Sequence, residues 1–297
     1  MKIAIYGQFY HKNSGGYIAS VLNALDKAKA DVYIEANFLE LIRANENIEK
    51  DYEGFETFSS LDDSFDLFFS IGGDGTILRS ITYVKDLNIP IVGINTGRLG
   101  FLATIQKDDL KEHIDHILNG EYSISERSLL QVKTTPATAM EGVLNFALNE
   151  VAVNRKNTTS MIRVATELNG EYLTSYWSDG LIVATPTGST GYSLSCAGPV
   201  IDPKSNSFVI TPIAPHNLNA RPFVIPDDTT IGLQVYGRED SYLLSLDSRI
   251  VTLANDTEVE ITRAPFTISL VQLNHDSFIK TIRQKLLWGE DKRNFKQ

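Results

Sequence analysis

The sequence contains only one cysteine, which excludes a disulfide within the chain. A lone cysteine, Cys196, among 297 residues is typical of a protein from a reducing compartment. Apolar runs are also short, and none approaches the roughly 20 residues that a membrane-spanning helix needs. The first residues become polar too early for a signal peptide. We therefore expect a soluble, cytoplasmic protein.

Basic residues are fewer than acidic ones: 27 Lys and Arg stand against 37 Asp and Glu, giving a formal net charge of −10. An acidic surface repels nucleic acid and anionic membrane, so we expect neither as a partner. The same charge repels small ligands that carry phosphate. Such a ligand must be held by local devices, namely backbone amides, helix N-termini, a few well-placed cations or a metal ion.

Several common site motifs are missing. The sequence has no G-x-x-x-x-G-K-[ST] P-loop, and the residues after Gly7 do not follow the G-x-G-x-x-G pattern. There is no G-x-S-x-G elbow to support serine hydrolase chemistry. The five histidines lack H-x-x-x-H spacing and cysteine partners, which argues against a zinc site.

What is present in residues 1–120 is an alternation of strand-like and helix-like segments. It predicts an α/β domain of Rossmann-like, kinase type, with a parallel sheet covered on both faces. The predicted strands are residues 2–6, 31–35, 65–71 and 89–94, and the predicted helices are residues 16–29, 38–45, 76–84 and 108–118.

Residues 121–274 instead hold short runs rich in β-branched residues, and Asn169-Gly170 is a strong hairpin signal. This domain is predicted to be an all-β sandwich. Its predicted strands include residues 129–134, 143–153, 161–168, 208–211, 230–236, 242–246, 258–263 and 266–270, with one helix at 190–196. Residues 275–297 contain a helix with an apolar stripe, which we expect to return to the first domain.

The sharpest motif is Gly72-Gly73-Asp74-Gly75-Thr76, where a predicted strand ends and a helix begins. Glycines let the backbone approach a bulky anion, and the helix N-terminus favours phosphate. A tight turn capped by Asp74 is the simpler alternative. A second segment, Asn95 to Leu102, follows the next strand and should lie at the same rim of the sheet. Its Phe101 could stack on a purine, or belong to the core.

Two motifs lie in the second domain. Asn149-Glu150 ends a β run, and the pair could grip ribose hydroxyls or an amide, or form an ordinary surface turn. Ser178-Asp179-Gly180 precedes the hydroxyl-rich run Thr185 to Ser195. That run suits recognition of sugar or phosphate, although a capped helix after a proline turn would use the same residues.

These motifs, taken in order with Pro215 to Pro222 and Leu246-Asp247-Ser248, resemble the NAD kinase family over essentially the whole chain. The glycine-rich loop alone is shared with lipid kinases and phosphofructokinases, so the combination carries the resemblance. It implies a homodimer or homotetramer with the site between domains and subunits. It also implies NAD as substrate and ATP, or a related donor, with a divalent metal such as Mg²⁺.

The resemblance implies that Asp74 is the catalytic residue, a general base that takes a proton from the 2′-hydroxyl of the adenosine ribose of NAD. The expected binding residues are Gly72, Gly73, Asp74, Gly75, Arg79, Asn95, Phe101, Asn149, Glu150, Asp179, Thr187, Thr190, Gly191, Tyr192 and Ser195, with Ala214 and Arg249 at positions that touch ligand in some members. Two residues depart from the family pattern. Gly191 stands where alanine is usual, and Trp177 where some members carry a polar group.

Two other hypotheses remain open at this point. One is a lipid or sugar kinase that uses the same glycine-rich loop. The other is a dinucleotide sensor without catalytic activity. Retention of Asp74 argues against the sensor, and formation of NADP from NAD and ATP would separate all three.

Overall fold

The structure is a computed structural model, which describes residues 1–8, 14–46, 48, 50, 52, 54–97, 99–103, 105, 110–156, 160–217, 219–273 and 277–289. The chain divides into two compact units. The α/β unit comprises residues 1–126 and 268–297, and the β unit comprises residues 127–267. The divisions fall inside two long strands, whereas the sequence predicts boundaries after residues 120 and 274.

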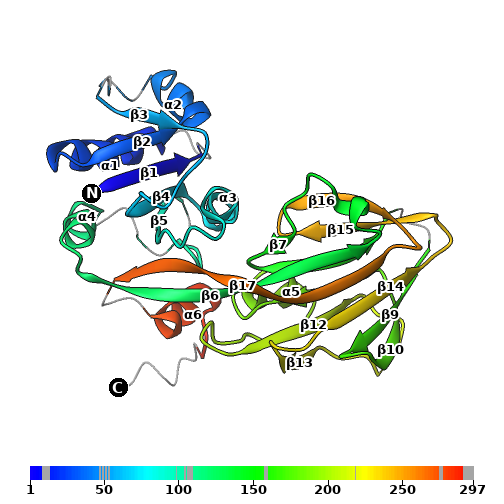
Figure 1. The fold of residues 1–297 in the computed structure, drawn as a ribbon. Helices are drawn as coiled ribbons and strands as arrows, with labels where there is room; N and C mark the ends of the chain where they lie inside the picture. Colours follow the sequence, from blue (N-terminus) through cyan, green and yellow to red (C-terminus); the bar gives the residue numbers. More distant parts are fainter. Residues whose placement is uncertain are drawn as a thin grey trace. The chain divides into compact units, whose positions relative to one another are not determined.

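The α/β unit contains a parallel sheet with strand order β3-β2-β1-β4-β5 (Figure 1). Its strands are β1 (Lys2–Gly7), β2 (Asp31–Glu35), β3 (Glu56–Phe58), β4 (Leu67–Gly72) and β5 (Ile91–Asn95). The end of a later strand adds to β5 in parallel, pairing Leu270 with Ile91. Strand β3 is not predictable from the sequence, because three residues with only one buried side chain give no periodicity.

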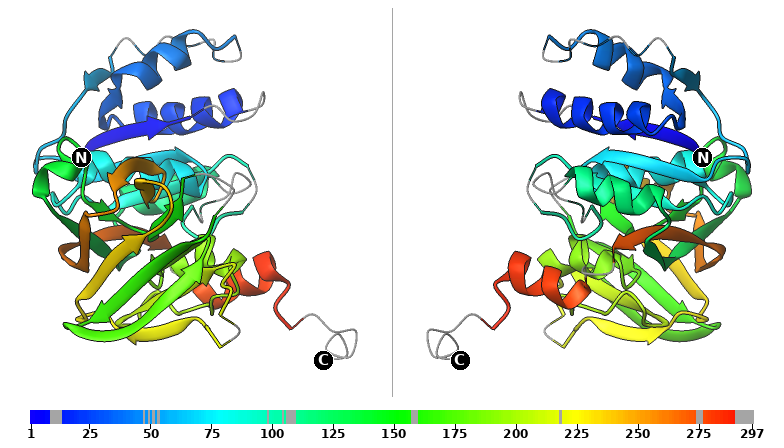
Figure 2. Two further views of the ribbon diagram at one scale, coloured as in Figure 1. Left: turned by 90° about the vertical axis from the view of Figure 1, so that its right-hand side faces the viewer. Right: turned by 90° about the vertical axis from the view of Figure 1, so that its left-hand side faces the viewer.

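Helices cover both faces of this sheet, as predicted. They are α1 (Ser14–Lys27), α2 (Ala36–Arg43), α3 (Asp74–Val84) and α4 (Leu110–Leu118), and Figure 2 shows α1 running alongside β1. Leu22 of α1 and Ile114 of α4 share one core with Phe69 of β4. The adjacent strand residue, Phe68, must point to the opposite face. There it stacks on Tyr83 of α3, with ring centroids 6.3 Å apart.

The strand order places the first binding motif. The chain runs outward from β1 to β3 and then returns to β4 on the other side of β1. Ligands of open α/β sheets bind at such a switch point, beyond the carboxyl ends of the strands. The turn after β4 contains Gly73 and Asp74 and therefore lies at this position.

The β unit is a sandwich, as predicted. One sheet is built from β10 (Glu171–Ser178), β9 (Ile162–Leu168), β14 (Ile231–Tyr236), β17 (Glu258–Leu273), β6 (Tyr122–Thr135) and β7 (Phe146–Ala147). The other has the order β13 (Phe223–Pro226), β12 (Ser207–Ile213), β11 (Gly180–Ala184), β8 (Glu150–Arg155), β15 (Ser241–Leu246) and β16 (Arg249–Ala254). Val164 and Leu233 from the first sheet share a core with Val183 and Leu244 from the second.

Four predicted elements of this unit need correction. The run 143–153 is not one strand, because residues 148 and 149 lie between β7 and β8. The runs 258–263 and 266–270 form a single strand, β17, which continues through Pro265. The predicted helix 190–196 is two short turns, η2 (Gly188–Thr190) and α5 (Tyr192–Ser195), and a further turn, η1 (Ala137–Met140), was not predicted.

The last described helix, α6 (Phe278–Leu286), belongs to the α/β unit, as predicted. It begins at Ser277, whose hydroxyl accepts a hydrogen bond from the Lys280 amide at 3.1 Å. Phe278 packs against Phe101, with ring centroids 6.4 Å apart. The helix therefore lies beside the loop that follows β5.

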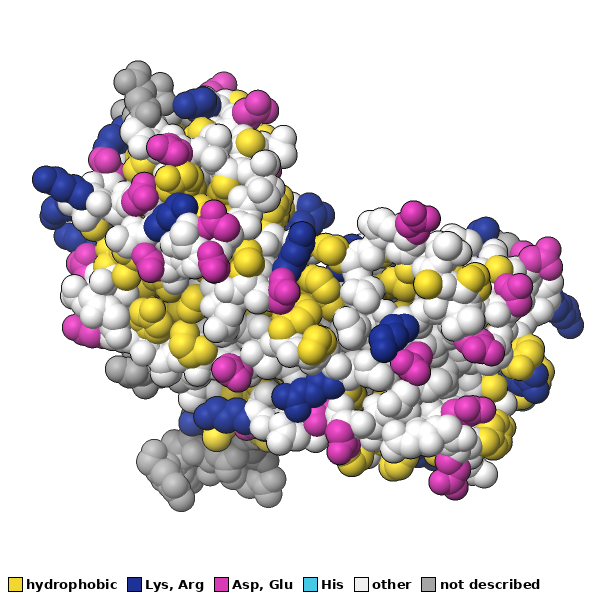
Figure 3. Space-filling model, viewed as in Figure 1, with side chains coloured by type: hydrophobic (Ala, Val, Ile, Leu, Met, Phe, Trp, Pro, Cys, Tyr) yellow, Lys and Arg dark blue, Asp and Glu magenta, His cyan; other side chains and the backbone are white. Residues whose placement is uncertain are grey.

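The surface carries charges of both signs. On the face drawn in Figure 3, Lys and Arg side chains are interspersed with Asp and Glu side chains. Within the described part of the chain, no helix is both long enough and apolar enough to cross a membrane.

Candidate active site

Asp74 is the first residue of α3, directly after the glycines that end β4. The first amide groups of a helix have no partners within the helix, and the helix dipole is positive at this end. A Cβ added at Gly73 or Gly75 would meet nothing within 4 Å. Packing of this chain therefore does not require glycine at either position, whereas a ligand lying against the backbone would.

The Asp74 carboxylate accepts three hydrogen bonds from the loop after β5. The Phe101 amide donates to Oδ2 at 2.8 Å, and the amides of Leu102 and Ala103 each donate to Oδ1 at 3.0 Å. Lys285 of α6 adds a positive charge, with Nζ 3.7 Å from Oδ2. Backbone amides do not rotate freely, so they fix the position of the carboxylate.

Two glycines make this arrangement possible. A Cβ on Gly100 would lie 1.9 Å from Asp74 Oδ1, so no side chain can stand there while the carboxylate keeps its place. A Cβ on Gly72 would lie 2.1 Å from the hydroxyl oxygen of Thr76, which accepts a hydrogen bond from the Gly73 amide. Close approach, and not turn flexibility alone, explains glycine at both positions.

The remaining predicted residues of the α/β unit have mixed surroundings. Asn95 is buried and bonded to its own loop, since its side chain accepts from the Gly97 amide at 2.7 Å and donates to the Ala103 carbonyl at 3.3 Å. Phe101 is half-buried, and the Lys285 ammonium lies 4.3 Å from the centroid of its ring. Arg79 is exposed on α3. Arg98, inside the predicted loop, lies outside the described residues.

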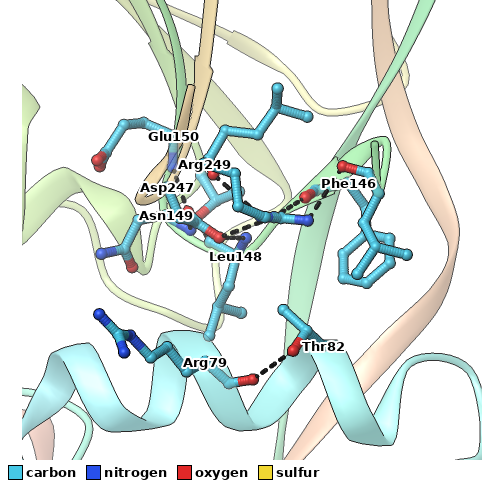
Figure 4. Close-up of polar contacts among 11 residues, drawn as sticks. Arg79, Thr82, Phe146, Leu148, Asn149, Glu150, Asp247 and Arg249 are labelled. Carbon is cyan, nitrogen blue, oxygen red and sulfur yellow. Dashed lines mark hydrogen bonds and ion pairs between the residues drawn. The ribbon is translucent and has the colours of Figure 1, made fainter. Parts of the chain in front are cut away.

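In the β unit, the Asn149-Glu150 motif is built around Asp247 (Figure 4). The Asp247 carboxylate accepts from the amides of Leu148, Asn149 and Glu150 at 3.0, 2.8 and 3.2 Å. These bonds replace strand pairing and explain the break between β7 and β8. Burial raises the pKa of Asp247, and the three amides and the Arg249 guanidinium, 3.6 Å away, oppose that rise.

Asn149 and Glu150 both present unused polar atoms. Asn149 Oδ1 and Glu150 Oε2 are buried and have no hydrogen-bond partner. Buried polar atoms are nearly always bonded in native proteins, so these two atoms on adjacent residues are candidates for ligand contact. Burial, reinforced by the Asp247 carboxylate, raises the pKa of Glu150 to about 8, although the Tyr192 amide bonds to it. Glu150 is therefore mostly protonated at pH 7 and supplies a donor, where the sequence analysis expected only acceptors.

The hydroxyl-rich run is largely bonded to itself. Thr185 donates to the Leu148 carbonyl at 2.6 Å, Ser189 to the Pro186 carbonyl at 2.6 Å and Thr190 to the Thr187 carbonyl at 3.1 Å. These hydroxyls shape the turn, but neither η2 nor α5 has a side-chain cap, so the capped helix of the alternative interpretation is not formed. Tyr192 and Ser195 are exposed and remain suitable for ligand contact.

Two glycines allow this run to pack closely against the Asn149-Glu150 motif. A Cβ on Gly188 would lie 2.0 Å from the Asn149 carbonyl oxygen. A Cβ on Gly191 would lie 3.0 Å from Glu150 Oε2. Gly191 thus leaves room beside one of the two orphaned atoms that an alanine methyl would partly fill.

Three other predicted residues of the β unit have different surroundings. Asp179 is half-buried and pairs with Arg155, with 2.9 Å between Oδ2 and Nη2. Ala214 is exposed and has a positive φ of 44°. Arg249 donates to the backbone carbonyls of Leu144 and Phe146, so its guanidinium holds the backbone that leads into the Asn149-Glu150 motif. Direct ligand contact by Arg249 remains a prediction.

Sequence reasoning missed the residues that act through others. Asp247 was seen only as part of a motif, and its role depends on three amides almost 100 positions away. Gly100 lies within the Asn95 to Leu102 segment and Lys285 within the C-terminal helix, and the sequence assigned neither of them a role. Among the described residues, no group of three His, Cys, Asp or Glu side chains could hold a metal ion.

Comparison with known proteins decides between the kinase families that share the glycine-rich loop. Residues 21–122 match the ATP-NAD kinase N-terminal domain, and residues 148–273 match the ATP-NAD kinase C-terminal domain. The chain belongs to the ATP-NAD kinase family. This confirms the predicted family, fold class and enzyme class, and makes ATP-dependent phosphorylation of NAD its class of reaction.

Similarity to individual members of the ATP-NAD kinase family extends over whole chains. An NAD kinase from Christiangramia forsetii is 62% identical over 294 residues, covering 99% of this chain and 100% of that protein. One from Porphyromonas gingivalis is 43% identical, covering 97% and 98%. A crystal structure of an Archaeoglobus fulgidus NAD kinase in complex with ATP has 26% identity and a TM-score of 0.73, covering 96% of this chain and 97% of that one. Yeast NADH kinase shares the fold, with 22% identity, a TM-score of 0.84 and coverage of 98% and 89%.

Proposed function

We propose that this chain transfers the γ-phosphoryl group of ATP to the 2′-hydroxyl of the adenosine ribose of NAD, forming NADP, with Asp74 as general base. The observation that carries the base assignment is a carboxylate fixed by three backbone amides at the switch point of the sheet. It adjoins two glycines whose missing side chains leave open space.

The reaction requires one proton transfer and one exchange of bonds at phosphorus. Asp74 takes the proton of the 2′-hydroxyl while the ribose 2′-oxygen forms a bond to the γ-phosphorus. The bond from that phosphorus to the bridging oxygen breaks, and ADP leaves with the electron pair. General base catalysis is typically worth about 10²- to 10⁴-fold. Positioning and neutralisation of phosphate charge supply the rest, for which amides of Gly73, Gly75 and the α3 N-terminus are available.

NAD recognition is assigned to the β unit. Protonated Glu150 can donate one hydrogen bond and accept others, and Asn149 adds a free carbonyl oxygen. Together they suit a ribose hydroxyl or an amide, each of which both donates and accepts. Asp179, Tyr192 and Ser195 are accessible enough to complete the contacts.

A divalent cation is proposed as a companion of ATP. Mg²⁺ commonly binds through substrate phosphates and only one or two carboxylates. The described residues contain no cluster that would hold the ion by themselves. The cation should therefore arrive with the donor, and NADP formation should depend on the Mg²⁺ to ATP ratio.

The test is to incubate the pure protein with NAD and MgATP and to assay the product with an NADP-specific dehydrogenase, with phosphorus NMR to identify the 2′-phosphate. Asp74→Asn should keep its melting temperature within a few degrees and its NAD binding, yet lose at least about 10²-fold in kcat. Asp86→Asn, an exposed carboxylate after the same helix, serves as control. Near wild-type turnover by Asp74→Asn would exclude it as the base, and phosphorylation of a lipid or sugar but not NAD would exclude the substrate.

Assembly and compartment complete the proposal. We propose a homodimer or homotetramer, in which exposed apolar side chains of the β unit such as Trp177, Phe223 and Val224, 48%, 45% and 46% exposed, would be covered. Light scattering coupled to size exclusion would measure the assembly. The unpaired Cys196 suits the cytoplasm, and fractionation of cells would test this location.

A further inference from the structure

The structure places a lysine from the far end of the chain next to the proposed base. Lys285 lies in the last turn of α6, and its Nζ is 3.7 Å from Asp74 Oδ2. The same ammonium lies 4.3 Å from the centroid of the Phe101 ring. All three residues belong to the α/β unit.

If Asp74 acts as a base, one of its oxygens must be free to accept a proton, yet both already have partners. Oδ1 already accepts from two amides, so Oδ2 is the oxygen available to a substrate hydroxyl. Oδ2 accepts one amide and faces the Lys285 ammonium. A carboxylate that keeps a nearby cation holds a proton less readily, because the cation stabilises its charged form. One of these partners must yield for the proton to be taken.

Lys285 is the partner that can move. The amides belong to the backbone of the loop, whereas the ammonium ends a flexible four-carbon chain. Its 3.7 Å separation from Oδ2 is an ion-pair distance, too long for a hydrogen bond. The Lys285 side chain is one third exposed, and its contact with the Phe101 ring survives small rotations because cation–π attraction tolerates up to about 6 Å.

We propose that Lys285 is a catalytic residue whose ammonium pairs with Asp74 before the donor binds and then moves to the oxygens of the transferring phosphoryl group. This inference rests on the proposed function. The 2′-hydroxyl proton goes to Asp74 Oδ2, the 2′-oxygen bonds to phosphorus, and the bridging bond breaks to release ADP. The Lys285 ammonium neutralises charge on the non-bridging oxygens.

If Lys285 had a purely structural role, that role would be to hold α6 in place. An ion pair between partly exposed groups is worth at most about 1 kcal/mol, so it contributes little to docking of α6. The helix also has its own anchors, the Phe278 contact with Phe101 and the cap at Ser277. Removing the ammonium should therefore leave α6 in place.

The test compares Lys285→Met, Lys285→Arg and Lys285→Ala with wild type in the NADP assay, with Lys280→Met, an exposed lysine of the same helix, as control. Lys285→Met should lose about 10²-fold or more in kcat, as expected for one charge-stabilising group, with KM for NAD within about threefold. Lys285→Arg should recover part of the loss. Ethylamine should rescue Lys285→Ala saturably, whereas ethanol should not.

Two results would overturn the inference while leaving the proposed function intact. One is a wild type that makes NADP together with a Lys285→Met variant whose kcat stays within threefold. The other is a Lys285→Ala variant whose lost activity no amine restores, together with a Lys285→Arg variant as impaired as Lys285→Met. That combination would mean that Lys285 acts only through the structure. If wild type itself makes no NADP, the proposed function fails and this inference fails with it. Should Lys285→Met not fold, Lys285→Gln takes its place.

Discussion

Replacing Glu150 by glutamine should stabilise this protein and flatten the pH dependence of its stability. Glutamine has the shape of a protonated glutamate but cannot ionise. Burial raises the pKa of Glu150 from its ordinary 4.5 to about 8 in the folded protein. A folded-state pKa above the unfolded one means that stability is complete below pH 4.5 and is lost as the pH rises through 8.

The size of this stability effect follows from the difference between the pKa of Glu150 in the folded and in the unfolded protein. Each pH unit between them is worth about 1.4 kcal/mol, so ionisation of Glu150 in the unfolded chain removes about 3 kcal/mol at pH 7 and about 5 kcal/mol above pH 9. Glu150→Gln avoids this loss. Because the amide donates as the protonated acid does, KM for NAD at pH 7 should change by less than about fivefold, which corresponds to about 1 kcal/mol.

Urea unfolding of both proteins between pH 4.5 and 9 provides the measurement. The free energies of unfolding should coincide near pH 4.5 and diverge steadily above it, with the variant more stable. Glu239→Gln, an exposed glutamate in the same unit, should follow wild type throughout. Parallel curves for wild type and Glu150→Gln would refute the reasoning, since Glu150 would then ionise equally in both states.

Two further substitutions test the supports of the site. Gly100→Ala places a Cβ where Asp74 Oδ1 lies and should lower kcat by about 10- to 10²-fold through displacement of the carboxylate. Steady-state kinetics should show no such loss for Gly16→Ala, whose Cβ enters open space. Asp247→Asn leaves an amide group facing one backbone N–H and leaves Arg249 without its counter-charge, so urea unfolding should show a loss of about 2–4 kcal/mol. An unchanged free energy of unfolding would show that Asp247 does not hold the motif together.

Much of the architecture could be predicted because its causes are local. The alternation of strands and helices up to residue 120 reflects periodicity within each segment, and β2 has the predicted bounds, Asp31–Glu35. The Asn169-Gly170 hairpin joins β9 to β10 as expected. Prediction failed where pairing overrides local pattern, as in β17, which continues through Pro265.

The sequence proposes where the candidate site lies, but it could not predict which of the site's polar atoms are already bonded. The glycine-rich turn, Asn149-Glu150 and the hydroxyl-rich run stay predicted binding motifs. Which hydroxyls are free was not predictable, because Thr185 and Ser189 bond to carbonyls chosen by the tertiary fold. The protonation of Glu150 was equally hidden, since it depends on burial and on Asp247.

The sequence by itself determined most strands and helices, because turn chemistry and side-chain periodicity act over a few neighbouring residues, and the order of its motifs carried the resemblance to the family. Only the tertiary structure decided which atoms of those motifs are available for chemistry. It brought Asp247 to the amides of residues 148–150 and Lys285 to Asp74, and it partly buried Glu150 near the Asp247 carboxylate. Desolvation and charge pairing depend on distance in space, which separation along the chain does not specify.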